Sequence, residues 1–299
     1  MQLSRTQFDI LTSLEREKDK KKLTQRDIAH SSDFSLGTVN KIMNHLNETG
    51  LVENNSITGK GIKALEPYRV KRAIFIAAGF GSRLVPITLN TPKPLVRVKG
   101  VRIIDTLLDA IVDLGIKEII IVRGYLSEQF DLLKNKYPDI KFIENPIYNE
   151  SNNISSMMYV RDLLQNTYIL ESDLLLANPS IITKYQYSSN YLGIPAERTD
   201  DWCFETRNGI ITKVKVGGRN CHQMIGISYW NNTDGQKMSE HIKQVFEMPG
   251  GRERFWDLVP LEYFIKEYSV EVRECSFDDV LEIDTYKELV NIDKAYKLM

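Results

Sequence analysis

The sequence predicts an α/β protein in which a small helical domain precedes a larger domain with a Rossmann-like, mixed and mostly parallel sheet. From residue 73 to residue 170, apolar runs typical of buried strands alternate with amphipathic segments, which is the pattern of β-α-β units. The first 68 residues instead indicate helices and one short hairpin. A length of 299 residues is sufficient for two domains. We place their boundary near Val70, which gives domains at 1–70 and 71–299.

Bulk composition is that of an ordinary globular protein, with 42% hydrophobic and 26% charged residues. The amino terminus is polar and no apolar run approaches the length of a membrane span, so we expect neither a secretion signal nor a membrane contact. The three cysteines are scattered and lack metal-ligand spacing, which fits a reducing, cytoplasmic location. Residues 1–72 have a net charge of +4 and the remainder −5, which permits a nucleic-acid partner without requiring one.

The amino-terminal segment reads as helix, helix, helix, hairpin, helix. Ser4 and Gln7 form a capping-box pattern, and Ser35 can cap a third helix that ends at Gly50. The turn at Asn54-Asn55 closes the hairpin. This order resembles the winged helix-turn-helix of the MarR-type family, which implies DNA binding through the third helix and a homodimer. Dimerisation or docking of a partner is the alternative use of residues 1–70. The outward face of the third helix carries Ser35, Thr38, Asn40, Lys41 and Asn44.

The larger domain changes character after Pro179. Before it, periodicity predicts strands at 73–77, 118–122, 141–144 and 168–170, and helices at 103–114, 127–137 and 154–164. After it, we expect antiparallel strands at 190–198, 202–207, 210–216 and 223–230, helices near 235–246 and 255–268, late strands at 271–275 and 280–283, and a closing helix at 285–296. Ligands of such sheets bind beyond the carboxyl ends of the parallel strands.

A glycine-rich turn follows the first of these strands. It runs from Ala77 to Leu84 as Ala-Ala-Gly-Phe-Gly-Ser-Arg-Leu, and Thr-Pro-Lys-Pro-Leu follows at 91–95. Its backbone N–H groups can cradle phosphate oxygens, and Arg83 and Lys93 add two positive charges. It is neither a P-loop nor a dinucleotide fingerprint, because no G-K-[ST] follows and Leu84 replaces the third glycine. The predicted nucleotide-binding residues of this loop are Ala77, Ala78, Gly79, Gly81, Ser82, Arg83 and Lys93.

Two acidic residues stand at predicted strand ends, Asp173 in Glu-Ser-Asp and Asp284 in Glu-Ile-Asp. Mg²⁺ commonly takes one or two protein carboxylates together with phosphate oxygens and water. We therefore predict that Asp173 and Asp284 hold Mg²⁺ beside the nucleotide; the alternative is a helix cap or loop carboxylate. The forked guanidinium of Arg83 suits the β and γ phosphates, and Lys93 is placed to stabilise the transition state at the α-phosphate. Lys93 and Arg83 are the predicted catalytic residues.

The string Gly79-x-Gly81-x-Arg83-Leu84 with Thr91-Pro92-Lys93-Pro94-Leu95 resembles the signature of the sugar-phosphate and choline-phosphate nucleotidyltransferases. The resemblance implies a nucleotidyltransferase domain in which the segment after the 118–122 strand lies near the base. Gly124 and Tyr125 are the candidates there. Asn153, beside Asn152, is a further candidate, with an Asn-rich helix cap as the alternative.

Aromatic residues near acids mark the carboxyl-terminal half and suggest the acceptor. A quaternary ammonium is bound by aromatic faces with one or two carboxylates, each face contributing about 0.5–2 kcal/mol. The predicted substrate-binding residues are Trp202, Tyr229, Trp256, Asp257 and Glu282; core packing is the alternative for each aromatic.

Residues 72–299 resemble bacterial CTP:phosphocholine cytidylyltransferases through Asp201-Trp202-Cys203-Phe204, Phe255-Trp256-Asp257 and Glu282-Ile283-Asp284. This implies Mg²⁺-dependent transfer of cytidylyl from CTP to phosphocholine, giving CDP-choline and pyrophosphate. The alternatives are phosphoethanolamine, 2-aminoethylphosphonate or a sugar 1-phosphate as acceptor, another NTP as donor, and a DNA-binding regulator that senses nucleotide.

Overall fold

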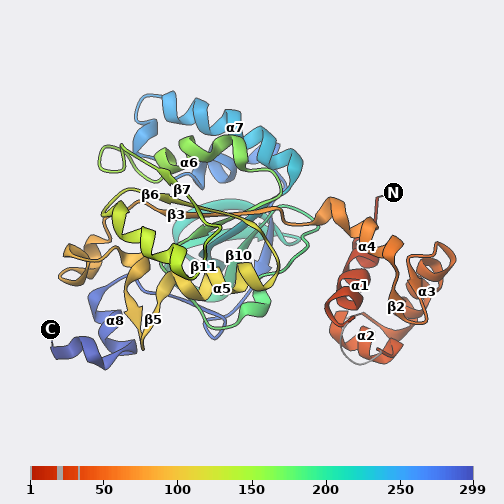
Figure 1. Cartoon of the computed structure of the whole chain (residues 1–299). Coiled ribbons are helices and arrows are strands. Elements are labelled where there is room, and N and C mark those ends of the chain that lie inside the picture. The colour runs from red at the N-terminus through yellow and green to blue at the C-terminus, as the bar shows by residue number, and fades with distance from the viewer. Residues whose placement is uncertain (1, 19–22, 33, 299) are drawn as a thin grey trace. The chain divides into compact units, whose positions relative to one another are not determined.

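The computed structural model describes residues 2–18, 23–32 and 34–298 (Figure 1). The chain divides into two compact units. One unit contains residues 1–69 together with Tyr185–Tyr187, and the other contains Val70–Lys184 and Ser188–Met299. Each unit has its own hydrophobic core.

The amino-terminal unit has the predicted order of elements: α1 (Arg5–Arg16), α2 (Gln25–Ser32), α3 (Leu36–Glu48), β1 (Val52–Glu53), β2 (Ser56–Ile57) and α4 (Gly59–Leu65). Ser4 forms the predicted capping box with Gln7, and the Ser35 hydroxyl accepts the Thr38 N–H at 3.1 Å. Asn54 and Asn55 take positive φ angles of 50° and 59°, which lets a two-residue turn close the β1–β2 hairpin. The winged helix-turn-helix prediction is therefore confirmed at the level of fold.

A distant segment completes the core of this unit. The Tyr187 ring stacks on the Tyr68 ring, with ring centroids 5.5 Å apart and an angle of 6° between the planes. The centroid of the Phe8 ring lies 5.3 Å from that of Tyr187. The Tyr187 hydroxyl donates to the Leu3 carbonyl at 3.1 Å. No local pattern predicts this contact, because Tyr187 follows Tyr68 by more than a hundred residues.

Replacing Tyr187 with alanine should destabilise the amino-terminal unit by about 2–4 kcal/mol, since it removes a packed ring from a small core. Tyr187→Phe retains the ring, loses one hydrogen bond, and should cost about 1 kcal/mol. Hydrogen exchange of the α1 amides measures the local stability directly. Unchanged α1 protection in Tyr187→Ala would show that the segment contributes nothing to this core.

The second unit is built on a seven-stranded sheet in the order β10-β12-β11-β8-β3-β6-β7. Strands β3 (Arg72–Ala77), β6 (Glu118–Arg123), β7 (Lys141–Glu144) and β8 (Thr167–Glu171) are mutually parallel, and β12 (Glu271–Glu274) pairs in parallel with β10 (Asn190–Arg207). Strand β11 (Ile210–Trp230) runs antiparallel to β8 and β10. The α/β fold class and the mostly parallel central sheet are thus confirmed.

Helices cover both faces of this sheet, α5 (Ile103–Asp113) on one side and α6 (Ile154–Val160) with α7 (Asn232–Glu247) on the other (Figure 1). Alternate side chains of β3 supply the two cores. Phe75 packs in the core that contains Leu107 of α5, whereas Ile74 packs with Met157 of α6 and Ile242 of α7.

Several predicted boundaries were wrong. The four strands expected between 190 and 230 are two long ones, β10 and β11, because the predicted breaks are absorbed as register shifts such as the one between Thr199 and Trp202. The helices expected at 127–137 and 255–268 are a 3₁₀ segment, Ser127–Asn135, and shorter turns at Val259–Tyr263 and Ile265–Glu267. Further 3₁₀ turns occupy Glu66–Tyr68, Ser82–Leu84, Ile87–Leu89, Lys93–Leu95, Arg161–Leu163, Pro179–Ile181, Gly251–Glu253 and Lys294–Leu298.

A small antiparallel ladder brings the two acidic strand ends together. Strand β9 (Leu174–Leu176) pairs with β13 (Val280–Glu282), with Leu174 opposite Glu282. Asp173 immediately precedes β9 and Asp284 follows β13, just before α8 (Tyr286–Ile292). A second short ladder, β4 (Arg97–Val98) with β5 (Val101–Arg102), follows the Lys93–Leu95 turn. In the part of the chain that the structure describes, every helix is too short or too polar to cross a bilayer.

Candidate active site

Gly81 joins the two halves of the glycine-loop signature. Its φ of 61° is left-handed, and a Cβ there would lie 2.9 Å from Lys93 Cβ and 3.1 Å from Thr88 Cγ2. The Thr88 hydroxyl donates to the Gly81 carbonyl at 2.8 Å. Any side chain at position 81 would therefore displace Lys93, which explains physically why the glycine turn and the Pro-Lys-Pro segment occur together.

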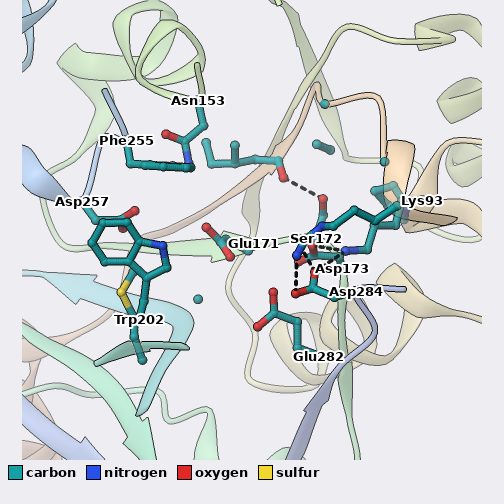
Figure 2. Close-up of a pocket in the computed structure, with 18 of the residues that line it drawn as sticks. Lys93, Asn153, Glu171, Ser172, Asp173, Trp202, Phe255, Asp257, Glu282 and Asp284 are labelled. Carbon is teal, nitrogen blue, oxygen red and sulfur yellow. Dashed lines mark hydrogen bonds and ion pairs between the residues drawn. The ribbon is translucent and has the colours of Figure 1, made fainter. Parts of the chain in front are cut away.

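Four side chains form an ion-pair network beside this loop (Figure 2). Lys93 Nζ lies 2.7 Å from Asp173 Oδ2 and 3.0 Å from Asp284 Oδ1. Arg83 donates to both carboxylate oxygens of Asp284, at 2.7 and 2.9 Å. Burial by itself would lower the pKa of Lys93, but Asp173 and Asp284 outweigh it and the pKa is raised. Lys93 is therefore a fully charged, buried cation, whereas the Arg83 side chain is 65% exposed.

The network lies at one end of a cavity of about 560 Å³. Gly79, Gly81 and Ser82 line the same end, and Trp202, Phe255 and Asp257 line the other. Glu171 lies between the two ends in Figure 2. The cavity thus has an anion-binding end and an aromatic, acidic end.

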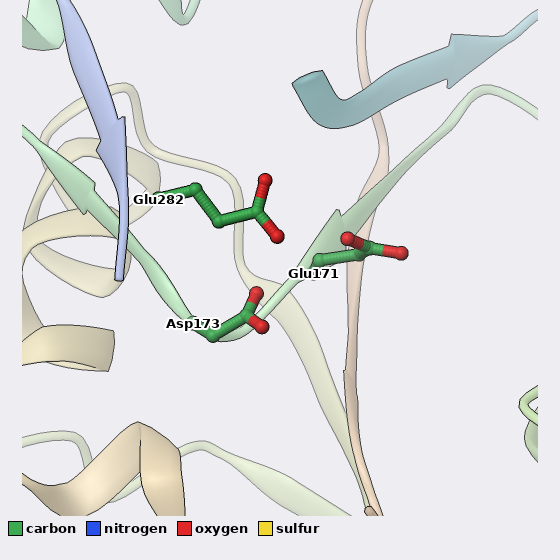
Figure 3. A group of neighbouring side chains, drawn as sticks. All are labelled: Glu171, Asp173 and Glu282. Atoms are coloured by element: carbon green, nitrogen blue, oxygen red, sulfur yellow. The ribbon is translucent and has the colours of Figure 1, made fainter. Parts of the chain in front are cut away.

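Three carboxylates meet in the middle, where oxygens of Glu171, Asp173 and Glu282 all lie within 4.8 Å of one another (Figure 3). Burial, together with Asp173, Asp257 and Glu282, raises the pKa of Glu171 well above its ordinary range. Burial and the neighbouring Asp173 and Asp284 raise the pKa of Glu282 to about 8. This crowding of negative charge favours a cationic ligand.

The donor set fits Mg²⁺, the metal that the sequence predicts. All candidate ligands are carboxylate oxygens, which are the hard ligands this ion prefers. Asp173 Oδ1 is shielded from solvent and has no hydrogen-bond partner among the described residues, so a ligand is needed to satisfy it. The structure places Glu171 and Glu282 with Asp173 in the three-carboxylate group, while Asp284, the other predicted ligand, pairs with Arg83 and Lys93.

The aromatic end differs from the predicted cage. Trp202, one of the predicted substrate-binding residues, lines the cavity, and Phe255 lies edge-to-face with it, with centroids 5.8 Å apart and planes at 69°. Tyr229 and Trp256, each 1% exposed, lie in the hydrophobic core instead. We therefore withdraw Tyr229 and Trp256 as substrate contacts.

Side-chain alternation explains this correction. On β11, Met224 and Gly226 line the cavity, so Tyr229, an odd number of residues from both, points to the opposite face and packs against Tyr168. Trp256 points away from the cavity and packs 6.1 Å from the Trp230 ring. Phe255 was missed, although it lies in the Phe-Trp-Asp segment that the sequence singled out.

Asp257, another predicted substrate-binding residue, lines the cavity and accepts a hydrogen bond of 2.5 Å from the Tyr191 hydroxyl. Burial raises the pKa of Asp257 to about 7, and the Tyr191 hydrogen bond only partly opposes this. In the absence of a ligand, Asp257 is thus partly protonated near neutral pH.

The stability of wild type relative to Asp257→Asn should therefore depend on pH in a defined direction. The pKa of Asp257 in the folded state lies above its unfolded value near 4. Between about pH 4 and pH 7 the folded protein therefore binds one more proton at Asp257 than the unfolded chain does. The free energy of unfolding falls as the pH rises through this window, because Asp257 must then ionise in a buried position. Asparagine still accepts from Tyr191 but does not ionise. The variant should gain about 2–3 kcal/mol relative to wild type between pH 5 and pH 8 in urea unfolding. Exposed Asp131→Asn should show no such change, and an equal response of both variants would contradict the assignment.

The residues predicted near the base support the loops around the cavity. Asn153 lines the cavity, but its side-chain Oδ1 accepts a hydrogen bond from the backbone N–H of Trp256 at 2.9 Å. This bond holds the turn at Phe255–Asp257. The Tyr125 N–H donates to Ala78 O at 3.1 Å, and its hydroxyl donates to Thr88 O at 2.9 Å. Gly124 packs so closely against Tyr148 that a Cβ would lie 2.7 Å from that ring. In this structure Ala78, Gly124 and Tyr125 buttress the glycine loop from behind, whereas Ala77, Gly79, Gly81 and Ser82 face the cavity.

Known proteins that resemble this chain include nucleotidyltransferases, in agreement with the chemistry that the cavity suggests. Residues 72–187 match the nucleotidyl transferase family and residues 1–56 match the MarR family. A 2-aminoethylphosphonate cytidylyltransferase of Lancefieldella rimae is 34% identical over 228 residues, covering 75% of this chain and 92% of that protein. A choline-phosphate cytidylyltransferase of Haemophilus influenzae is 30% identical over 226 residues, covering 74% and 95%.

A solved CTP:phosphocholine cytidylyltransferase from Streptococcus pneumoniae superposes with a TM-score of 0.71 at 30% identity, covering 76% of this chain and 99% of that chain. Fold and site thus define a nucleotidyltransferase. More narrowly, the chain belongs to the cytidylyltransferase family of these relatives and carries an additional MarR-type unit at its amino terminus. The resemblance predicted from the sequence is confirmed.

Proposed function

We propose that this protein transfers the cytidylyl group of CTP to a small acceptor with a phosphate or phosphonate at one end and a cationic nitrogen at the other. The observation that carries the proposal is the two-ended cavity, with Lys93 and Arg83 at one end and Trp202, Phe255 and Asp257 at the other. Phosphocholine, the acceptor that the sequence predicts, has this form. So does 2-aminoethylphosphonate, which appears in the name of the Lancefieldella rimae relative.

In the proposed reaction, the chemistry takes place at the phosphate end of the cavity. The glycine loop and Arg83 bind the triphosphate, and Lys93 stabilises the charge that develops at the α-phosphate. The acceptor oxygen is already an anion, so no general base is needed to activate it. Asp173, with Glu282 or Asp284, would hold Mg²⁺, which supplies neutralising charge at the phosphates when bound.

The test is a matrix of Mg²⁺, each of the four NTPs and a panel of acceptors, with released pyrophosphate as the readout. The panel contains phosphocholine, phosphoethanolamine, 2-aminoethylphosphonate and glucose 1-phosphate. We expect release with CTP and the nitrogen-bearing acceptors, and a product mass equal to the acceptor plus a cytidylyl group. Release only with glucose 1-phosphate, or with no pair at all, would refute the proposal.

For the amino-terminal unit, we propose DNA binding through α3. The observation that favours it is the face predicted from the sequence, on which Ser35, Thr38, Asn40, Lys41 and Asn44 are all exposed. Gel shift with the DNA upstream of the chain's own coding sequence tests this, with Lys41→Ala expected to weaken binding. Absence of any shift, together with a dimer in light scattering, would favour the alternative use in dimerisation.

A further inference from the structure

Glu171 occupies a fixed position between the phosphate end and the aromatic end of the cavity (Figure 2). It closes β8, and Gly226 of β11 lies directly against it. A Cβ at position 226 would lie 2.5 Å from Glu171 Oε2 and 2.7 Å from Glu171 Cβ. Only glycine therefore leaves room for this carboxylate, and the strand beneath it restricts the directions in which it can turn.

The Glu171 carboxylate lacks a protein donor. Within residues 2–18, 23–32 and 34–298, the Glu171 side chain forms no hydrogen bond or ion pair, whereas the Asp257 side chain accepts from Tyr191 and that of Asp173 pairs with Lys93. A half-buried carboxylate without donors is best satisfied by a ligand that brings N–H groups, because charge-assisted hydrogen bonds are the strong ones.

The aromatic wall beside it is small. Trp202 and Phe255 meet nearly at right angles, and Phe255 is itself 40% exposed. The two other aromatic residues expected in a cage, Tyr229 and Trp256, are core residues. A trimethylammonium group donates no hydrogen bonds and depends on such faces, whereas a primary ammonium offers three N–H donors.

We propose that Glu171, held in place by Gly226, selects acceptors with a primary ammonium over those with a quaternary ammonium. This inference rests on the proposed function and narrows its acceptor to the aminoethyl phosphate or aminoethyl phosphonate class. Glu171 accepts N–H hydrogen bonds from the ammonium group, and each N-methylation removes one donor.

The experiment uses the full chain with CTP, Mg²⁺ and four acceptors that share one phosphate: phosphoethanolamine and its mono-, di- and trimethylated forms, the last being phosphocholine. We expect kcat/KM to fall along the series, by at least tenfold from the first to the last. In Glu171→Gln, kcat/KM for phosphoethanolamine should fall at least tenfold while that for phosphocholine changes less than threefold. Glu247→Gln, an exposed glutamate outside the cavity, is the matched control and should behave as wild type.

Gly226→Ala supplies a second variant, which retains the Glu171 carboxylate but displaces it. In this variant too, the difference in kcat/KM between phosphoethanolamine and phosphocholine should become smaller. CTP binding and thermal unfolding of each variant confirm that it remains folded. A flat or reversed series in wild type would overturn the inference and leave the proposed function standing. Equal losses with all four acceptors in Glu171→Gln, with a higher Mg²⁺ requirement, would also overturn it, since Glu171 would then act as a metal ligand. No pyrophosphate with any of the four acceptors, and none with 2-aminoethylphosphonate, would overturn both.

Discussion

Lys93→Ala should lower kcat by about 10³-fold while raising the KM for CTP only a few-fold. The ammonium group lies at the end of the cavity to which the proposed reaction assigns the α-phosphate, and Lys93 is only 7% exposed. A preorganised donor aimed at developing charge in a shielded site contributes about 10²–10³ in kcat even when it is neutral, and Lys93 is charged. Arg83 is retained in this variant and, in the proposed reaction, binds the β and γ phosphates once they displace Asp284.

Lys93 also balances Asp173 and Asp284, so its removal carries a cost in stability. Thermal unfolding and CTP titration calorimetry on Lys93→Ala separate that cost from the catalytic effect. Lys93→Arg keeps the charge that balances Asp173 and Asp284, so it should recover stability better than it recovers kcat, because the planar fork does not place a compact charge where the ammonium group lies. Exposed Lys141→Ala serves as control. A variant with unchanged kcat and a much higher KM for CTP would assign Lys93 to nucleotide binding alone.

Much of the fold could be predicted because the signals are local. Alternation within β3 separates Phe75 from Ile74, and this period of two already implies helices on both faces. Ser4 and Ser35 cap the helices that they were expected to cap. The glycine turn was found for the same reason, because its conformational demands fall on consecutive residues.

The sequence did not reveal features that depend on distant contacts. Tyr187 packs on Tyr68 although no pattern links them. In the cavity, the alternation of side chains along β11 separates Gly226 from Tyr229, and this signal is local. The pairing of Arg83 with Asp284 is different, because two charges about 200 residues apart carry no signal of their contact in a single sequence.

Asp284→Asn should abolish most turnover and yet tighten the binding of pyrophosphate in the absence of metal. In the protein without nucleotide, Asp284 holds Arg83 through two hydrogen bonds and Lys93 through one, so a triphosphate must displace this carboxylate to reach either cation. When phosphates bind without metal, they take Arg83 and Lys93 from Asp284 and leave its negative charge without a cation. When phosphates bind together with Mg²⁺, the metal can pair with the Asp284 carboxylate. Asparagine removes the competitor and the potential metal ligand together.

Titration calorimetry in EDTA should show pyrophosphate binding about tenfold more tightly to Asp284→Asn than to wild type, which corresponds to roughly 1.4 kcal/mol. Steady-state assays with Mg²⁺ should show kcat reduced at least 100-fold, the scale set by removing one electrostatic contributor to the transition state. Asp109→Asn, which breaks an exposed pair with Lys136, controls for the loss of a surface charge and should change neither quantity. If Asp284→Asn instead weakened metal-free pyrophosphate binding, the carboxylate would be needed to orient Arg83 and Lys93 rather than to restrain them, and phosphates would not compete with Asp284 for these two cations.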